Sequence, residues 1–183
     1  MEEIKPSIQT QDVEPQYNIS VNKFFFLSFI TFGLYSIWWF YKAWRFFKQL
    51  ENSRSHPVIR AVLGIFFFIP LTNKIINLAK RKSYQKNYSP TLLFIAYLFT
   101  ISLSYLPAPF SLISIFASVF LIEPFKALNF VKINSTGYEV VEQNSFNERQ
   151  IFLIVIGSLW WLLILISSFF LLVNEPEYPN YYQ

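Results

Sequence analysis

The carboxyl-terminal part of the chain contains an uninterrupted run of 23 uncharged residues, from Ile151 to Val173. As an α-helix this run is about 35 Å long at 1.5 Å per residue, which exceeds the roughly 30 Å hydrocarbon core of a bilayer. Across all 183 residues, 54% are hydrophobic and only 14% are charged, well outside the usage of soluble domains. The sequence therefore predicts an integral membrane protein in which residues 151–173 form a transmembrane helix.

The amino-terminal part predicts a polar tail followed by a second transmembrane helix. Residues 1–23 are polar, contain two prolines and show no hydrophobic periodicity, so we expect a disordered tail. Residues 24–41 contain no charged residue over 18 positions, which predicts one transmembrane helix. Residues 174–183 are expected to form a second polar tail.

The middle of the chain predicts a transmembrane hairpin. An uncharged stretch of 36 residues ends before Glu123 and is interrupted by Pro107 and Pro109, so it is too long and too broken for one helix. We expect two helices, at about 90–106 and 109–123. Ser89 and Pro90 are typical of an N-cap and a first-turn residue, and they predict the start of the first of these helices.

Residues 61–73 are harder to assign, because they offer only 13 uncharged positions and include Pro70. Lys and Arg concentrate on the cytoplasmic side of a membrane. If this segment dips into the membrane and returns, 13 of the 15 Lys and Arg share one side; if it crosses, only 10 do. We therefore expect an all-α polytopic helical bundle with four transmembrane helices and one re-entrant or interfacial helix within 58–79. Both termini would then lie opposite the basic loops; the alternative is five transmembrane helices.

Residues 124–150 are expected to form a soluble loop. Its first residues, up to Val131, have apolar side chains at helical spacing, which predicts an amphipathic helix at the membrane surface that breaks at 134–137. Glu123 and Lys126 are spaced for an i,i+3 ion pair, worth a few tenths of a kcal/mol.

Aromatic residues gather where the first predicted transmembrane helix meets a basic stretch. Amphipathic rings favour the headgroup layer of a membrane, so an interfacial belt is the favoured interpretation and a cage for a cationic ligand the alternative. The belt residues are Trp38, Trp39, Tyr41 and Trp44.

Small and hydroxyl-bearing residues recur at helical spacing in the predicted hairpin. Such residues allow close helix packing in lipid, which is the favoured interpretation, while a polar path for a solute is the alternative. The helix-packing set is Ala96, Thr100, Ser104, Ser111, Ser114 and Ser118.

Basic residues cluster after the predicted re-entrant segment. Without a soluble domain beside them, an anionic lipid surface fits these residues better than RNA does. The predicted lipid-binding set is Lys74, Lys80, Arg81, Lys82 and Lys86.

Residues 31–44, which read T-F-G-L-Y-S-I-W-W-F-Y-K-A-W, resemble a signature of a family of small bacterial inner-membrane proteins of unknown function. The resemblance extends to H-P-V-I-R-A from His56, L-P-A-P-F from Leu106 and E-P-F-K-A-L-N from Glu123. It implies a multi-pass protein of a bacterial inner membrane, and it implies no catalytic residue because the family has no assigned activity. Ala108 departs from the acidic residue that the pattern has at this position.

The residue inventory argues against most catalytic and metal sites. The chain has no cysteine and one histidine, His56, so thiolate ligands, multi-histidine sites and Ser-His-Asp or Cys-His arrangements lack the necessary residues. We expect no enzyme, no cofactor, no metal and no nucleic-acid partner. The expected function is a small membrane subunit or regulator that binds anionic lipid, a protein partner or its own copies. The alternative is an oligomeric transporter or channel for a solute or lipid.

Overall fold

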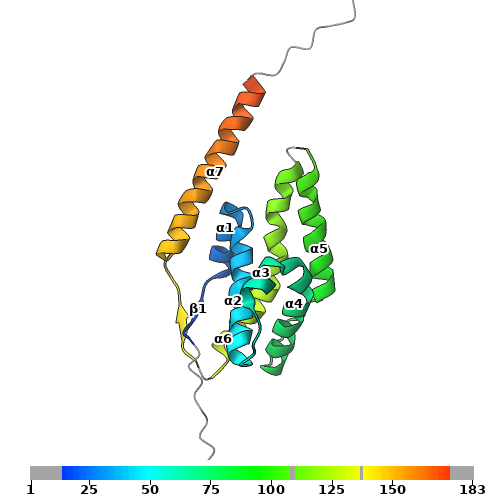
Figure 1. Ribbon diagram of the computed structural model, residues 1–183, viewed down its shortest axis with the longest axis vertical. Helices are drawn as coiled ribbons and strands as arrows, with labels where there is room; N and C mark the ends of the chain where they lie inside the picture. Colours follow the sequence, from blue (N-terminus) through cyan, green and yellow to red (C-terminus); the bar gives the residue numbers. More distant parts are fainter. Residues whose placement is uncertain (1–13, 108–109, 137, 174–183) are drawn as a thin grey trace, which may run out of the picture.

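The computed structural model describes residues 14–107, 110–136 and 138–173. Over these residues the chain is mostly helical, as expected, with seven α-helices, two 3₁₀ helices and one pair of short strands (Figure 1). In chain order the elements are β1 (Gln16–Asn18), α1 (Val21–Ile30), α2 (Leu34–Leu50), α3 (Pro57–Val62), α4 (Gly64–Arg81), α5 (Pro90–Ser102), η1 (Leu103–Tyr105), η2 (Phe110–Leu121), α6 (Ile122–Ile133), β2 (Val140–Glu142) and α7 (Glu148–Val173).

Helices α1 and α2 form a hairpin, so the prediction of one continuous helix over 24–41 is wrong. The chain reverses at Phe32 and Gly33, whose φ angles of 53° and 86° lie in the left-handed region. The ring centroids of Phe24 and Trp39 are 5.8 Å apart. Fifteen residues of continuous helix would separate them by about 22 Å. The left-handed turn at a glycine therefore overrides the uniform hydrophobicity of this segment.

Residues 16–18, shortly before α1, are part of the fold. β1 pairs in parallel with β2, with Gln16 opposite Val140 and Asn18 opposite Glu142. The expectation of a disordered tail is therefore wrong for residues 16–23; residues 1–13 and 174–183 lie outside the described residues. This pairing places residues 16–18 beside the segment that follows α6.

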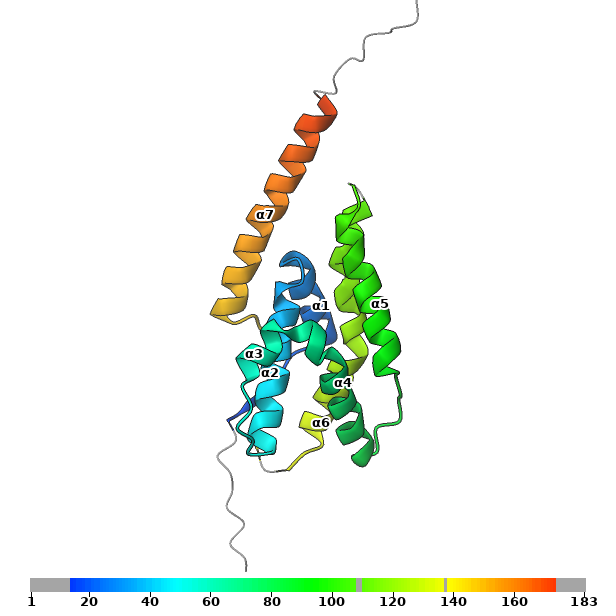
Figure 2. The same cartoon turned by 45° about the vertical axis from the view of Figure 1, so that its right-hand side comes forward.

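The segment expected to be re-entrant or interfacial forms α3 and α4, which meet at Leu63. In Figure 2, α3 lies across the middle of the molecule and α4 descends from it beside α6. The carboxyl-terminal end of α4 thus returns to the end of the molecule where α2 also ends. Both basic stretches, 42–60 and 74–90, meet there, and an ion pair between Glu51 and Lys74 joins them.

Helix α5 and the 3₁₀ helix η2 form the predicted hairpin, side by side and antiparallel (Figure 1). The Ser89 hydroxyl accepts a hydrogen bond from the Leu92 amide at 3.4 Å, which confirms the predicted N-cap. The second arm is a 3₁₀ helix rather than the expected α-helix. At about 2.0 Å per residue, its 12 residues cover about 24 Å instead of about 18 Å.

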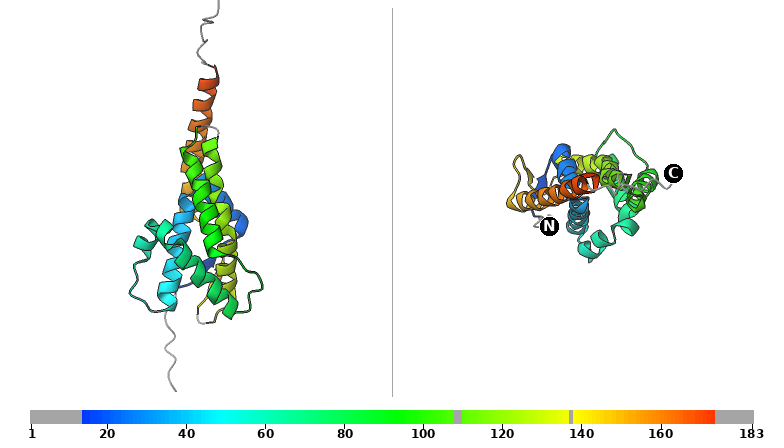
Figure 3. Two further views of the ribbon diagram at one scale, coloured as in Figure 1. Left: turned by 90° about the vertical axis from the view of Figure 1, so that its right-hand side faces the viewer. Right: turned by 90° about the horizontal axis from the view of Figure 1, so that it is seen from above.

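Helix α7 begins three residues before the predicted transmembrane helix and extends beyond the rest of the molecule (Figure 3). Most of its side chains are exposed. Within the described residues, two helical stretches are long and apolar enough to cross a membrane: Phe110–Ile133 and Glu148–Phe170.

The core lies where α1, α2, α4 and α6 meet and is dominated by aromatic side chains. The rings of Phe24 in α1 and Phe125 in α6 stack with centroids 4.4 Å apart. Phe40 in α2 and Phe68 in α4 lie 5.8 Å apart. All four are buried, so they fix these helices against one another and support the region where the polar side chains gather.

Candidate functional site

A cleft of about 890 Å³ lies between α2, the β1–β2 pair, the end of α6 and the start of α7. Its volume falls within the range of ligand sites, about 300–1,000 Å³. Four basic side chains from three helices line it: Lys42 and Arg45 of α2, Lys132 of α6 and Arg149 of α7. We call this site the basic cleft.

Lys132 is the most unusual of these residues because its side chain is buried and carries no ion partner. Only 7% of the residue is exposed, and its Nζ lies 5.8 Å from the centroid of the Phe46 ring. Among the described residues its Nζ has no hydrogen-bond acceptor and no carboxylate within 4.0 Å. A buried charge is costly unless it is paired. The cleft therefore presents a positive charge that the described residues do not neutralise.

The pKa of Lys42 is lowered by burial and by the same excess of positive charge in the cleft. Burial lowers the pKa of its ammonium group, and the nearby Arg45 guanidinium lowers it further. The Glu14 carboxylate raises this pKa in part, and Arg149 lowers it again. An anion placed among these groups would be attracted by several cations at once.

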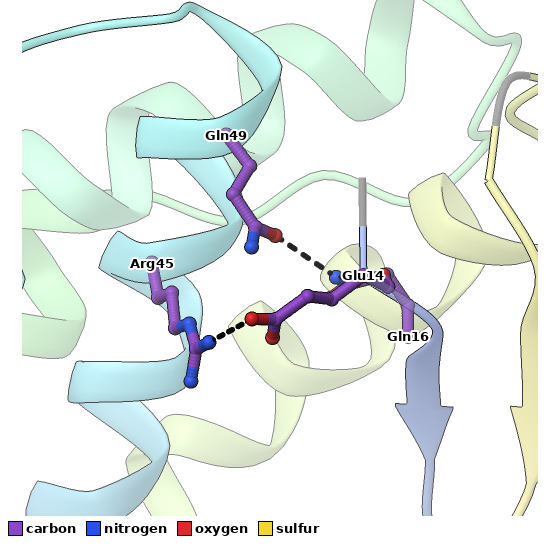
Figure 4. Close-up of polar contacts among 4 residues, drawn as sticks. All are labelled: Glu14, Gln16, Arg45 and Gln49. Carbon is purple, nitrogen blue, oxygen red and sulfur yellow. Dashed lines mark hydrogen bonds and ion pairs between the residues drawn. The ribbon is translucent and has the colours of Figure 1, made fainter. Parts of the chain in front are cut away.

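The β1 side of the cleft is held to α2 by two polar contacts (Figure 4). Glu14 forms an ion pair with Arg45, and the Gln16 side-chain amide donates to the Gln49 Oε1 atom at 3.2 Å. Glu14 and Glu148 are the acidic residues that line the cleft, against its four basic residues. The site therefore carries a positive excess even when the Glu14–Arg45 pair is formed.

The base of α7 is fixed by a reciprocal capping arrangement. Asn147 Oδ1 accepts from the Gln150 amide at 2.9 Å, and Gln150 Oε1 accepts from the Asn147 amide at 3.1 Å. Gln150 also donates to the Tyr35 hydroxyl at 3.1 Å. The sequence N-E-R-Q carries this signal, so the start of α7 at Glu148 could have been predicted from it.

One wall of the cleft is apolar. Trp38 of α2 and Phe152 and Leu153 of α7 line it beside the cations. Trp38 is 40% exposed and Phe152 is 64% exposed, and the Lys42 Nζ lies 5.6 Å from the Trp38 ring centroid. The cleft can thus contact both a charged group and a hydrocarbon group.

The predicted lipid-binding residues do not gather into one site. Lys74 is paired with Glu51, Nζ to Oε2 at 2.6 Å, and the Lys82 ammonium donates to the Asn134 carbonyl oxygen at 3.0 Å. The three other members of the set are exposed and form no hydrogen bond or ion pair with the described residues: Lys80, Arg81 and Lys86. They lie at or after the end of α4, outside the basic cleft.

The predicted aromatic belt is wrong for two of its four residues. Trp39 and Trp44 are buried, with 6% and 2% of their surfaces exposed. Trp44 packs beneath the Arg60 guanidinium, whose carbon lies 4.5 Å from the ring centroid. These two rings occupy the inner face of α2, which a count of aromatic residues does not distinguish from the outer face. Trp38 and Tyr41 remain on the outside, with centroids 5.2 Å apart.

The hairpin packing set is divided in the same way. Thr100 and Ser118 are buried, while Ser104 is exposed and so does not lie in the packed seam. The Thr100 hydroxyl donates to the Ala96 carbonyl and the Ser114 hydroxyl to the Ser111 carbonyl, each within its own helix. The ion pair predicted between Glu123 and Lys126 is confirmed, with Nζ and Oε1 2.8 Å apart.

The described residues contain no group of three or more His, Cys, Asp or Glu side chains placed to hold a metal ion. No protein-family model, no curated protein and no solved structure matches the chain.

Proposed function

We propose that this chain is an integral membrane protein whose basic end lies at a membrane surface and binds anionic lipid there, as a non-enzymatic subunit or regulator. The observation that carries this proposal is the separation of charged from uncharged segments. Four segments contain no charged residue: 24–41, 61–73, 87–122 and 150–173. Three of them form the α1–α2 turn, the α5–η2 hairpin and α7, which point toward the same end of the molecule (Figure 1).

The surface of the uncharged end supports a lipid environment. Large apolar side chains are exposed there on several elements, among them Phe99 at 66%, Tyr105 at 90% and Phe169 at 64%. Extended apolar surface is rare on soluble monomers and is the surface that acyl chains would cover.

The opposite end supports contact with anionic headgroups. Lys80, Arg81 and Lys86 are exposed without ion partners among the described residues, and the whole chain has a net charge of +4. Each Lys or Arg near an anionic surface contributes about 1 kcal/mol of attraction. The hydroxyl groups of Thr100 and Ser114 bond to their own helices, which favours a packed hairpin over a solute path.

The test is lipid retention by the purified chain in a non-ionic detergent. We expect native mass spectrometry to show phosphatidylglycerol adducts in preference to phosphatidylcholine adducts. Changing Lys80→Gln, Arg81→Gln and Lys86→Gln together should reduce that preference. The matched control exchanges the same positions with charge retained, as Lys80→Arg, Arg81→Lys and Lys86→Arg. Equal retention of the two lipids by all three proteins would refute the proposal.

A further inference from the structure

The basic cleft contains a charge whose partner is missing from the described residues. Lys132 lies at the end of α6, where the chain buries its side chain beside Phe46 and within reach of the positive field of Lys42. A purely structural lysine at such a position would be expected to reach a carboxylate or a carbonyl oxygen. Because Lys132 lines an open cleft instead, its counter-charge can come from a bound anion.

The geometry of the other cations narrows the class of anion. Lys42 and Arg45 are three residues apart on α2 and so share one face, and Arg149 faces the same cleft from α7. Guanidinium groups present paired N–H donors that match the oxygens of phosphate, and ammonium groups add point charges. The cleft is lined by four cationic and two acidic side chains. This excess of positive charge suits a ligand with a phosphate group better than a ligand with one carboxylate.

The apolar wall indicates that the ligand has a hydrocarbon part. Trp38, Phe152 and Leu153 line the cleft at the point where the uncharged part of α7 begins. A ligand with its phosphate beside Lys132 would have its acyl chains against α7, in the direction in which that helix extends. This continuity of charged and apolar walls fits an amphiphile.

We propose that the basic cleft binds the phosphate of an anionic phospholipid between Lys132, Lys42, Arg45 and Arg149, with the acyl chains against the start of α7. This inference rests on the proposed function only in placing the cleft at headgroup level. It concerns a single defined site, whereas the proposed function concerns the exposed cations at the end of α4.

Glu14 acts as a built-in competitor in this scheme. Its carboxylate pairs with Arg45 inside the cleft, and its side chain is 55% exposed, so it can leave without losing buried contacts. A phosphate that enters takes over the Arg45 guanidinium and releases Glu14 into water. Exposed ion pairs are weak, so this displacement costs little.

The main test is calorimetric titration of the full chain in dodecyl maltoside with dihexanoyl phosphatidic acid. We expect saturable binding of one lipid per chain. Lys132→Met replaces the lysine with an unbranched side chain that is one atom shorter and uncharged, and it should weaken binding by at least about tenfold. Lys126→Met is the matched control, because Lys126 lies on the same helix but pairs with Glu123 outside the cleft. It should leave the affinity unchanged.

Two further ligands separate the possible sources of the phosphate. Dihexanoyl phosphatidylcholine carries the same chains and no net charge, and inorganic phosphate carries the charge without chains. We expect both to bind more weakly than the phosphatidic acid. If inorganic phosphate bound as tightly, the site would be one for free phosphate and the lipid assignment would be overturned. If phosphatidylcholine bound as tightly, the role of the cations would be overturned.

Two more variants distinguish a loss of ligand binding from a loss of folding. Glu14→Gln removes the competitor and should tighten binding by up to about fivefold, the value of an exposed ion pair. The triple change at Lys80, Arg81 and Lys86 should leave this calorimetric affinity unaltered, even where it reduces phosphatidylglycerol adducts. Unchanged affinity in both Lys132→Met and Glu14→Gln would refute phosphate binding in the basic cleft, and it would not affect the proposed function.

Discussion

Gly157 of α7 packs against the backbone carbonyl of Ile30, the last residue of α1, and a methyl group at position 157 would overlap that oxygen. The Ile30 Cγ1 atom would also lie only 3.1 Å from the added carbon. Gly157 is buried, whereas the residues on either side of it in α7 are exposed. The absence of a side chain at this position therefore sets how closely α7 approaches α1, as small residues do between helices in lipid.

We expect Gly157→Ala to lower the stability of the chain in detergent by about 1–3 kcal/mol, because the backbone carbonyl cannot move aside without shifting α1. Thermal unfolding followed by circular dichroism would measure the loss. Gly64→Ala is the control: the nearest atom to its added carbon, Phe40 Cγ, is 4.0 Å away, an ordinary contact distance. Similar unfolding temperatures for the two variants would show that α7 is not seated against α1 as described.

The turn between α1 and α2 can be tested at Gly33, where an added Cβ would meet nothing within 4 Å. Only the positive φ of 86° opposes a side chain there. Gly33→Val should therefore destabilise the chain by roughly 1–2 kcal/mol, and Gly33→Asn by less, because Asn tolerates the left-handed region. A continuous helix over 24–41 would instead be stabilised by both changes, because Val and Asn are both better helix formers than Gly. Unfolding temperatures in detergent separate the two outcomes.

Labelling of single cysteines can test the arrangement of the two ends in a membrane, because the chain has no native cysteine. In the proposed orientation, cysteines at Asn22, Arg54 and Asn87 react with a membrane-impermeant maleimide from one side of sealed vesicles. A cysteine at Tyr105 reacts from the other side. Labelling after permeabilisation with detergent is the control for intrinsic reactivity. A cysteine at position 22 that reacted from the same side as one at position 105 would restore the single transmembrane helix over 24–41.

The contact between Tyr35 and Gln150 ties α2 to the base of α7. Both residues are buried, and their side chains are hydrogen bonded at 3.1 Å. Tyr35→Phe should cost about 1–2 kcal/mol, because the Gln150 Nε2 group loses its acceptor in a buried place. Tyr41→Phe is the control, as the Tyr41 hydroxyl forms no hydrogen bond within the described part of the chain. Equal stability of both variants, measured by thermal unfolding, would show that the contact does not anchor α7.

Local signals in the sequence predicted several elements well. The capped start of α5 at Ser89, the apolar run of α7 and the spacing of Glu123 and Lys126 each depend on residues within one helix. The hairpin of α1 and α2 was missed because an uncharged run was counted as a helix without regard to Gly33. An isolated glycine within such a run is itself a signal for a break in the helix, and at Gly33 it is compatible with two helices joined by a turn.

The basic cleft could not be predicted in the same way. β1 and β2 are three residues long and lie more than 100 residues apart in the chain, so neither gives a clear strand pattern. The burial of Lys132 depends on Phe46, which belongs to another helix. The sequence therefore predicted a binding site in the dense basic run around the end of α4. In the structure, the basic cleft is instead lined by four basic residues from three separate helices.

The parallel pairing of residues 16–18 with residues 140–142 has a consequence for biosynthesis. The α1–α2 and α5–η2 hairpins join neighbouring segments and can form while the ribosome is still adding residues. The strand pair must wait until residue 142 has emerged, because its two members lie more than 100 residues apart in the chain. Lys42 and Arg45 are therefore in place long before the wall opposite them exists. A nascent chain arrested before β2 would have its hairpins but no cleft, so that ligand binding would distinguish completed chains from unfinished ones.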